Sequence, residues 1–193
     1  MASSSSSDTS SNFSLKSLIY RPAAAAAAAN GEPASLQVLD QLLLPAEKTY
    51  IDVPDIQTTY SVIHTMQIRG APLIAIVACL GLAVDLQNDV STKELQAIET
   101  MNTMERSANA IYAYIQGKMD YVAKSRPTAV NLFNALQEVK EALLKAKDDD
   151  DSSDPPSVRM VNAVVQHAEF MLQRDEADCR AIGKNGADAI ILD

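Results

Sequence analysis

The sequence predicts an α+β protein that is mostly helical, with a small amino-terminal antiparallel β-sheet followed by a helical bundle. Two short segments, residues 35–40 and 49–53, alternate apolar and polar side chains, as half-buried strands do. An apolar segment at residues 73–86 has the composition of a helix that is buried on most of its circumference. Amphipathic segments follow it, so the second half of the chain is expected to form the bundle.

The amino-terminal residues supply the rest of the predicted sheet. Residues 13–20 are expected to form its first strand, and the alanine-rich residues 21–34 a low-complexity loop before the second strand. Residues 1–12 are mostly serine, which indicates a disordered tail. The alternative for this tail is an organelle transit peptide, because the segment is also poor in acidic residues.

Several helix starts can be located from local signals. Proline suits the first turn of a helix, so helices are expected to open at Pro54, Pro72 and Pro127. Residues 91–94, Ser-Thr-Lys-Glu, have the spacing of a capping box, in which the serine and glutamate side chains bond to first-turn amides. A further helix is therefore predicted to begin there.

The carboxy-terminal half is predicted to consist of helices and one linker. A helix is expected at residues 106–123. Residues 148–156 are acidic and contain proline, which is typical of a solvated linker. Two separate amphipathic helices are then expected, at residues 158–172 and 176–192. Residues 13–193 together are expected to form one domain.

Charge and cysteine content limit the classes of function. The net charge of −9 and the isoelectric point near 4.7 argue against general nucleic-acid binding, which depends on clustered lysine and arginine. Two cysteines form no disulfide framework and suit a reducing compartment. The longest apolar run is interrupted by Asp85 and is too short to span a bilayer. We therefore expect a cytoplasmic protein, with the nucleus as a second location.

Two motifs place an arginine directly before a predicted helix. In the first, RGAP, Arg69 precedes the buried helix, and Gly70 lets the backbone approach a ligand closely. In the second, SRPTAVN, Arg126 precedes a proline, and Thr128 and Asn131 add polar groups. Helix starts bind anions, and guanidinium pairs well with phosphate oxygens, so both arginines could bind one phosphate. The alternative is that each arginine bonds to a nearby carbonyl or an acidic side chain.

Four sequence blocks, in family order, carry a resemblance to a known enzyme family. They are residues 35–45 (SLQVLDQLLLP), 68–86 (IRGAPLIAIVACLGLAVDL), 125–132 (SRPTAVNL) and 175–187. Together they resemble the methylthioribose-1-phosphate isomerases over most of residues 13–193. The alanine-rich segment at residues 21–34 departs from the family, which joins those strands briefly.

The resemblance implies a site and a reaction. Arg69, Gly70, Ala71 and Arg126 are expected to bind a sugar phosphate, and Asn131 matches the family as well. The family converts 5-methylthioribose-1-phosphate to 5-methylthioribulose-1-phosphate in methionine salvage, with no metal or redox cofactor. Full-length members are expected to be homodimers. No nucleic acid and no membrane are expected as partners.

The resemblance also implies that this chain is only the amino-terminal half of such an enzyme. The family's catalytic cysteine lies in a Thr-His-Cys-Asn-Thr-Gly motif, and its catalytic aspartate follows. Both are expected to lie beyond Asp193, in a carboxy-terminal Rossmann-like domain that is absent from this sequence. The chain alone is therefore expected to be inactive. Its last helix is expected to leave apolar side chains partly bare, at Leu172, Ile182, Ile190, Ile191 and Leu192.

No other residues support a stronger hypothesis. Cys79 lies in an apolar helix and is expected to be inert, and acidic neighbours of Cys179 disfavour its thiolate. His64 and His167 have no cysteine or carboxylate at metal-ligand spacing. The sequence GKNG at residues 183–186 echoes a KH nucleic-acid module, but the surrounding acidic residues oppose it. The alternatives to the isomerase are a non-catalytic subunit related to the translation-initiation exchange factor, and a ribose-1,5-bisphosphate isomerase.

Overall fold

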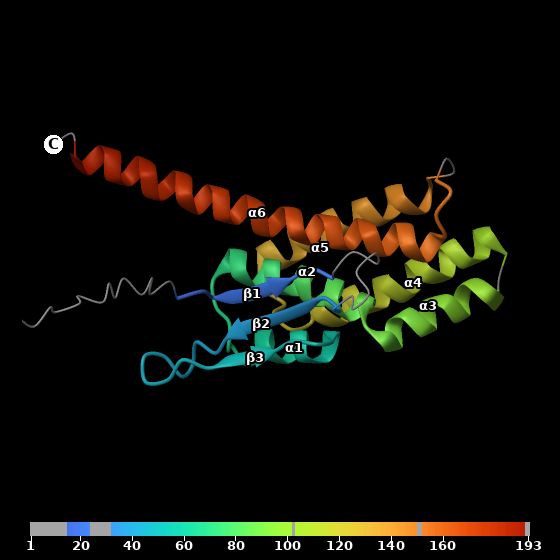
Figure 1. Ribbon diagram of the computed structural model, residues 1–193, viewed down its shortest axis with the longest axis horizontal. Coiled ribbons are helices and arrows are strands. Elements are labelled where there is room, and N and C mark those ends of the chain that lie inside the picture. Colours follow the sequence, from blue (N-terminus) through green and yellow to red (C-terminus); the bar gives the residue numbers. More distant parts are fainter. Residues whose placement is uncertain (1–14, 24–31, 102, 150–151, 192–193) are drawn as a thin grey trace, which may run out of the picture.

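The computed structural model describes residues 15–23, 32–101, 103–149 and 152–191, in which three strands precede six helices (Figure 1). This arrangement confirms the predicted fold class. The elements, in chain order, are β1 (Leu18–Arg21), β2 (Ser35–Leu39), β3 (Tyr50–Asp52), α1 (Ile56–His64), α2 (Ala71–Gln87), α3 (Asp89–Met101), α4 (Met104–Ala123), α5 (Val130–Lys147) and α6 (Pro156–Ile191).

The three strands form an antiparallel sheet in the order β1-β2-β3. Val38 is the central register residue, opposite Leu18 on one side and Ile51 on the other. The side chains of Leu36 and Val38 are buried, so one face of β2 covers the helical core. β1 extends to Arg21, which is the first residue of the predicted low-complexity loop. The predicted tail and most of that loop, residues 1–14 and 24–31, lie outside the described residues.

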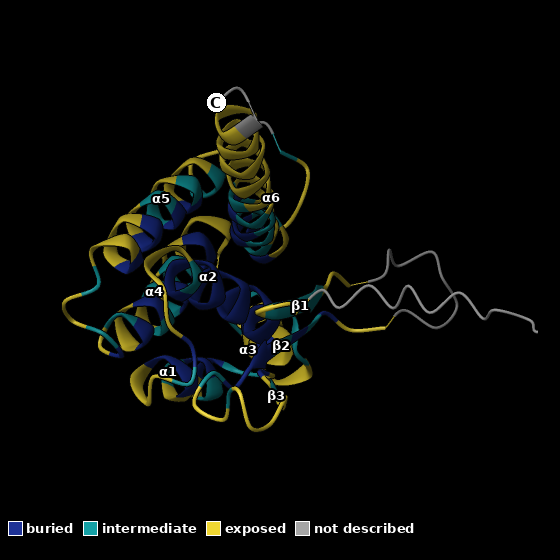
Figure 2. Cartoon of the chain, turned by 90° about the vertical axis from the view of Figure 1, so that its left-hand side faces the viewer, coloured by how far each residue is buried: buried dark blue, intermediate teal, exposed yellow. Residues whose placement is uncertain are grey.

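Helix α2 is the centre of the fold, as its continuous apolar run predicts (Figure 2). Every residue from 74 to 86 is buried, and the helix packs against α1, α3, α5 and α6. Gly81 allows α1 to approach closely. A Cβ atom at this position would lie 2.7 Å from Thr59 Cγ2, well inside van der Waals contact.

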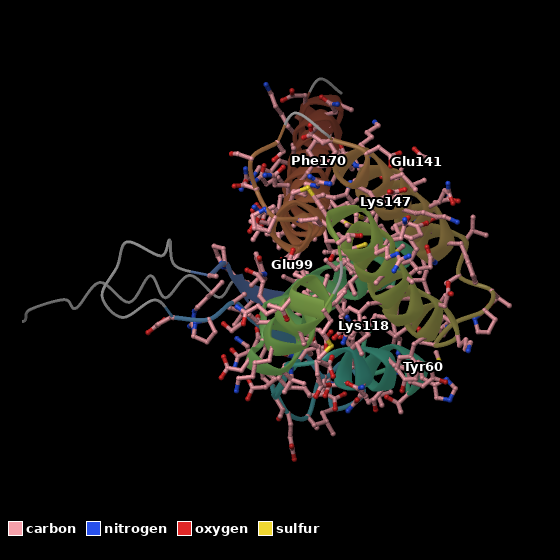
Figure 3. The ribbon with its side chains drawn as sticks, turned by 90° about the vertical axis from the view of Figure 1, so that its right-hand side faces the viewer. Tyr60, Glu99, Lys118, Glu141, Lys147 and Phe170 are labelled. Atoms are coloured by element: carbon pink, nitrogen blue, oxygen red, sulfur yellow. The ribbon has the colours of Figure 1, made fainter. Side chains whose placement is uncertain are left out.

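A buried carboxylate connects four helices near the end of α2. Asp85 is 2.7 Å from Lys118 Nζ and accepts a hydrogen bond from the Ile56 amide at 3.0 Å. Ser91 Oγ lies 3.4 Å from the same carboxylate and 3.2 Å from the Tyr114 hydroxyl. Burial alone would lower the pKa of Lys118, but its hydrogen bonds to Asp85 and Tyr114 raise that pKa overall. The Lys118 side chain therefore reaches this network as a cation (Figure 3).

The predicted capping box at Ser91 is wrong. Helix α3 begins at Asp89, and the side chain of Asn88 accepts the Ser91 amide at 2.9 Å, as an amino-terminal cap does. Ser91 lies inside the helix and is buried against Asp85. Asn88 and Ser91 both have a side chain that can cap a helix. Because the Ser91 side chain contacts Asp85, Asn88 is the residue that caps α3.

Three further helix boundaries differ from prediction. Helix α1 begins at Ile56 with Asp55 as its cap, so Pro54 lies before the helix and not in its first turn. Helix α5 begins at Val130, because Pro127 occupies a turn closed by the Ala129 amide on the Arg126 carbonyl at 3.0 Å. The two helices predicted at 158–172 and 176–192 are one helix, α6, of 36 residues. The polar sequence Gln-Arg-Asp at 173–175 has no glycine or proline to end a helix, so α6 continues through it.

The carboxy-terminal part of α6 projects beyond the bundle (Figure 1). Residues 176–190 are all exposed; Ile182 and Ile190 retain 72% and 79% of their accessible surface. Leu172 is half-buried, so these three residues are as bare as expected. No single described helix is long and apolar enough to cross a membrane; α2 and α3 meet that test only as a pair bent by 65°.

The last residues of the chain leave two expectations untested. The side chain of Ile191 and all of Leu192 and Asp193 lie outside the described part of the chain, so the expected exposure of the first two has no structural counterpart. The expectation that a Rossmann-like domain with the catalytic residues follows Asp193 stays a prediction.

Candidate functional site

Two helices, α2 and α5, begin at the same end of the bundle (Figure 1). Gly70 is the residue before α2 and has a φ of 104°, a conformation that glycine adopts without strain. Ala129 is the residue before α5. No side chain caps either helix. Because Pro72 has no N–H and the Leu132 amide bonds to the Ala129 carbonyl at 2.9 Å, the amides left to bind an anion are those of Ala71 and Leu73 in α2 and of Val130 and Asn131 in α5.

The two predicted arginines stand before these helix starts with their charges uncompensated. Arg69 is exposed, and only its Nε donates, to the Met66 carbonyl at 3.3 Å. Arg126 is half-buried. Within the described ranges, neither guanidinium has a carboxylate oxygen within 4 Å. The alternative that the arginines pair with acidic side chains is therefore wrong, and the carbonyl contact of Arg69 leaves both Nη atoms available.

A contact between α1 and the turn before α5 ties the two arginine-bearing segments together. His64, the last residue of α1, has its Nδ1 3.2 Å from the Ser125 carbonyl oxygen. Ser125 is buried and donates its hydroxyl hydrogen to the Val122 carbonyl at 2.6 Å. The ring of His64 also stacks on Tyr60, with centroids 5.3 Å apart. His64 is therefore a structural residue that holds the Arg126 turn beside the end of α1.

A cavity of about 300 Å³ lies where the starts of α2 and α5 meet the middle of α6. Pro72 and Asn131 are contributed by the two helix starts, so the two motifs reach one cavity. The remaining wall combines apolar side chains with polar ones, and its carboxylates outnumber its one arginine, so it suits the hydroxyl groups of a ligand better than an anionic group. Its charged residues are Glu138, Arg174, Asp175 and Asp178. Arg69 and Arg126 do not line this cavity. That Arg69, Gly70, Ala71 and Arg126 bind one phosphate stays a prediction.

The cysteines and the second histidine provide no nucleophile at this site. Cys79 is fully buried in α2, and burial, with the charge of Glu138, raises the pKa of its thiol to about 12. Cys179 is exposed on α6. His167 Nε2 lies 3.4 Å from Glu138 without hydrogen-bond geometry, and burial lowers the pKa of His167 despite that carboxylate. No group of three metal-ligating side chains occurs in the described segments.

Sequence reasoning missed two parts of the site. The α6 residues Arg174 and Asp175 line the cavity, but they are distant in the chain from the two arginine motifs and only the fold brings them to it. Asp40 and Gln67 were also missed. Asp40 is buried and accepts a hydrogen bond at 2.9 Å from Nε2 of Gln67, which lies two residues before Arg69. No pattern in the sequence indicates that these two residues, 27 positions apart, form a hydrogen bond.

Comparisons with known proteins agree with the motif resemblance. Residues 67–192 match the initiation factor 2 subunit family. The chain is 41% identical over 157 residues to a methylthioribose-1-phosphate isomerase of Uncinocarpus reesii, and 38% identical over 159 residues to one of Drosophila persimilis. Each alignment covers 81% of this chain, but only 37% and 39% of those proteins. The resemblance to these isomerases is therefore confirmed over a minor part of their length.

Two solved structures share the fold. The 5-methylthioribose 1-phosphate isomerase of Pyrococcus horikoshii aligns with a TM-score of 0.54 and 25% identity, over 72% of this chain and 34% of that chain. The translation initiation factor eIF-2B subunit delta from A. fulgidus aligns with a TM-score of 0.55 and 20% identity, over 84% and 38%. At that lower identity the second likeness concerns the fold alone.

Proposed function

The chain belongs to the initiation factor 2 subunit family, and we propose that it forms the phosphate-binding part of a methylthioribose-1-phosphate isomerase. The observation that carries this proposal is the pair of uncapped helix starts, α2 and α5, each preceded by an arginine without a carboxylate partner among the described residues. Such an end of the bundle is complementary to a dianion. The identity with named isomerases selects the sugar phosphate among possible anions.

In this proposal the positively charged groups and the carboxylates of the site bind different parts of the substrate. The amides of α2 and α5, with Arg69 and Arg126, bind the C1 phosphate of 5-methylthioribose-1-phosphate. The carboxylates and amide groups of the neighbouring cavity, such as Asn131 and Asp175, accept or donate hydrogen bonds to ribose hydroxyls. Binding by the phosphate fixes the sugar ring for proton transfer, which needs an acid or base at the ring.

We propose further that this chain by itself does not catalyse the isomerisation. Cys79 is buried with its pKa raised to about 12, so it supplies neither a thiolate nor contact with substrate. Cys179 is exposed on α6 and does not line the cavity. The Thr-His-Cys-Asn-Thr-Gly motif that the family resemblance assigns to catalysis does not occur in residues 1–193. The chain spans less than two-fifths of the isomerases that it matches, at 37% and 39%.

A titration of the purified chain with 5-methylthioribose-1-phosphate tests the binding function. We expect Arg69→Gln and Arg126→Gln each to weaken binding by about 10- to 100-fold, the usual value of a hydrogen bond between charged groups. Arg106→Gln is the control, because Arg106 is an exposed arginine in the first turn of α4, at the other end of the bundle (Figure 1). Binding that is absent, or equal in all three variants, would reject the phosphate site.

A further inference from the structure

Asp40 is a buried carboxylate that hydrogen-bonds to the segment just before the candidate site. It retains 7% of its accessible surface, and within the described residues no cation lies within 4 Å of it. Its two oxygens accept the Leu42 amide at 3.0 Å and Gln67 Nε2 at 2.9 Å. A carboxylate away from water is costly unless it is hydrogen-bonded, so these two bonds account for its position.

Gln67 is held from three directions by this arrangement. Its side-chain Nε2 donates to Asp40, and its backbone carbonyl oxygen accepts a hydrogen bond from the Gln41 amide at 2.8 Å. Its side-chain oxygen accepts the Thr65 hydroxyl at 3.1 Å. The loop after β2 is therefore fastened directly to the residue that stands two positions before Arg69.

The turn between α1 and α2 needs such a fastening. Met66 has a φ of 63°, which is unfavourable for a residue with a side chain, and Gly70 has a φ of 104°. A conformation of this kind persists only where the surroundings hold it. Ile68 is fully buried and anchors the turn on its inner side, while Arg69 is exposed. The outer side is held through Gln67.

We propose that Asp40 is a positioning residue that, through Gln67, holds the turn carrying Arg69 in the orientation that binds phosphate. The inference rests on the proposed phosphate site for its functional consequence. Its structural content is independent of that site: without the Asp40–Gln67 bond, the outer side of the Met66–Gly70 turn is held less firmly and Arg69 becomes more mobile, although the bond from the Gln41 amide to the Gln67 carbonyl remains. Asp40 itself does not touch the phosphate.

An exchange of the two side chains tests the bond. In Gln67→Glu two carboxylates face each other and the bond is lost. Adding Asp40→Asn restores it with its direction reversed, because the asparagine Nδ2 then donates to the new carboxylate at position 67 while its Oδ1 still accepts the Leu42 amide. Gln37→Glu is the matched control, since Gln37 Nε2 makes the same kind of bond, 2.7 Å long, to Asp52 on the exposed sheet.

Two measurements on each variant of the 193-residue chain separate the structural part of the inference from the functional part. Trypsin cleavage after Arg69, scored by intact mass against cleavage after the exposed Arg180, reports the release of the turn. Titration with inorganic phosphate reports binding. We expect Gln67→Glu to raise relative cleavage after Arg69 and weaken phosphate binding, each by about tenfold, as the loss of a charged hydrogen bond predicts. The exchanged pair should restore both to within about twofold, and Gln37→Glu should change neither.

The outcomes distinguish the positioning of Arg69 by Asp40 from the proposed phosphate-binding function. Unchanged cleavage after Arg69 in Gln67→Glu, or no recovery in the exchanged pair, overturns the inference. A general rise in cleavage at Arg69 and Arg180 alike overturns it too, because it shows global destabilisation. If the cleavage pattern holds but the parent chain binds no phosphate, the positioning of Arg69 stands and the proposed function fails. If Gln67→Glu does not fold, Gln67→Met, which removes the Nε2 donor without adding a charge, is measured in its place, and unchanged cleavage after Arg69 relative to Arg180 again overturns the inference.

Discussion

Replacing Gly81 with alanine should destabilise the protein, although the same change usually stabilises a helix. The added Cβ would overlap Thr59 Oγ1 and lie 2.7 Å from its Cγ2. Thr59 is fully buried, and its hydroxyl donates to the Asp55 carbonyl at 2.8 Å, so it cannot rotate away without losing that bond. Overpacking costs about 1–3 kcal/mol, and the better helix propensity of alanine returns about 1 kcal/mol. With the strained hydrogen bond included, we expect a net loss of about 2 kcal/mol.

Urea denaturation followed by circular dichroism measures this loss, and Gly117→Ala is the control. Gly117 lies within α4 with no atom near the position of an added Cβ, so alanine there should add up to about 1 kcal/mol of stability. Combining Gly81→Ala with Thr59→Ala should recover part of the loss, because the second change removes Oγ1 and Cγ2. A Gly81→Ala variant as stable as Gly117→Ala would refute the close approach of α1 to α2.

Three further predictions concern burial and charge. Lys118→Met should cost about 3–5 kcal/mol in denaturation, because it leaves Asp85 buried without its cation. The raised pKa of Lys118 means that its stabilisation is complete below its ordinary pKa of 10.5 and is lost as the pH rises through the higher folded-state pKa, so the parent chain should lose stability at strongly alkaline pH more steeply than the variant. Iodoacetamide should modify Cys179 in the native chain and Cys79 only in denaturant, as intact mass would show; early modification of both contradicts the buried thiol. The exposed apolar side chains of α6 should bind a hydrophobic dye and promote self-association, so Ile182→Lys should reduce both dye fluorescence and the sedimentation of oligomers. Unchanged values would show that α6 is not the surface responsible.

The parts of the fold that follow from the sequence are those that periodicity controls. The unbroken apolar run identified α2, and alternation identified β2 and β3. Helix boundaries were less accessible. Ser91 and Asn88 both offer caps, and only the contact of Ser91 with Asp85, six residues away in the chain but on another helix, selects Asn88. The continuity of α6 does not follow from its periodicity, because the polar residues 173–175 interrupt the apolar pattern without ending the helix.

The parts of the candidate site that lie within one short motif could be predicted from the sequence, whereas contacts between residues distant in the chain could not. Arg69 and Arg126 could be selected because an arginine next to a helix start has a direct chemical meaning. The contribution of Arg174 was hidden, since no local pattern links α6 to the starts of α2 and α5. The same is true of the Asp40–Gln67 bond, which joins residues 27 positions apart. Such contacts depend on how the sheet and the helices dock.

The two ends of α2 explain how a very apolar helix can serve a charged ligand. Near its carboxyl end Asp85 is tied to Lys118 and to the first amide of α1, which fixes the helix along its axis. Its middle is enclosed by apolar side chains, so the helix cannot shift or turn without opening the core. Its amino end, in contrast, has no side-chain cap and follows directly on Arg69. A fixed helix without a side-chain cap at its amino end needs little rearrangement when an anion binds, so this preorganisation would favour the phosphate binding that we propose.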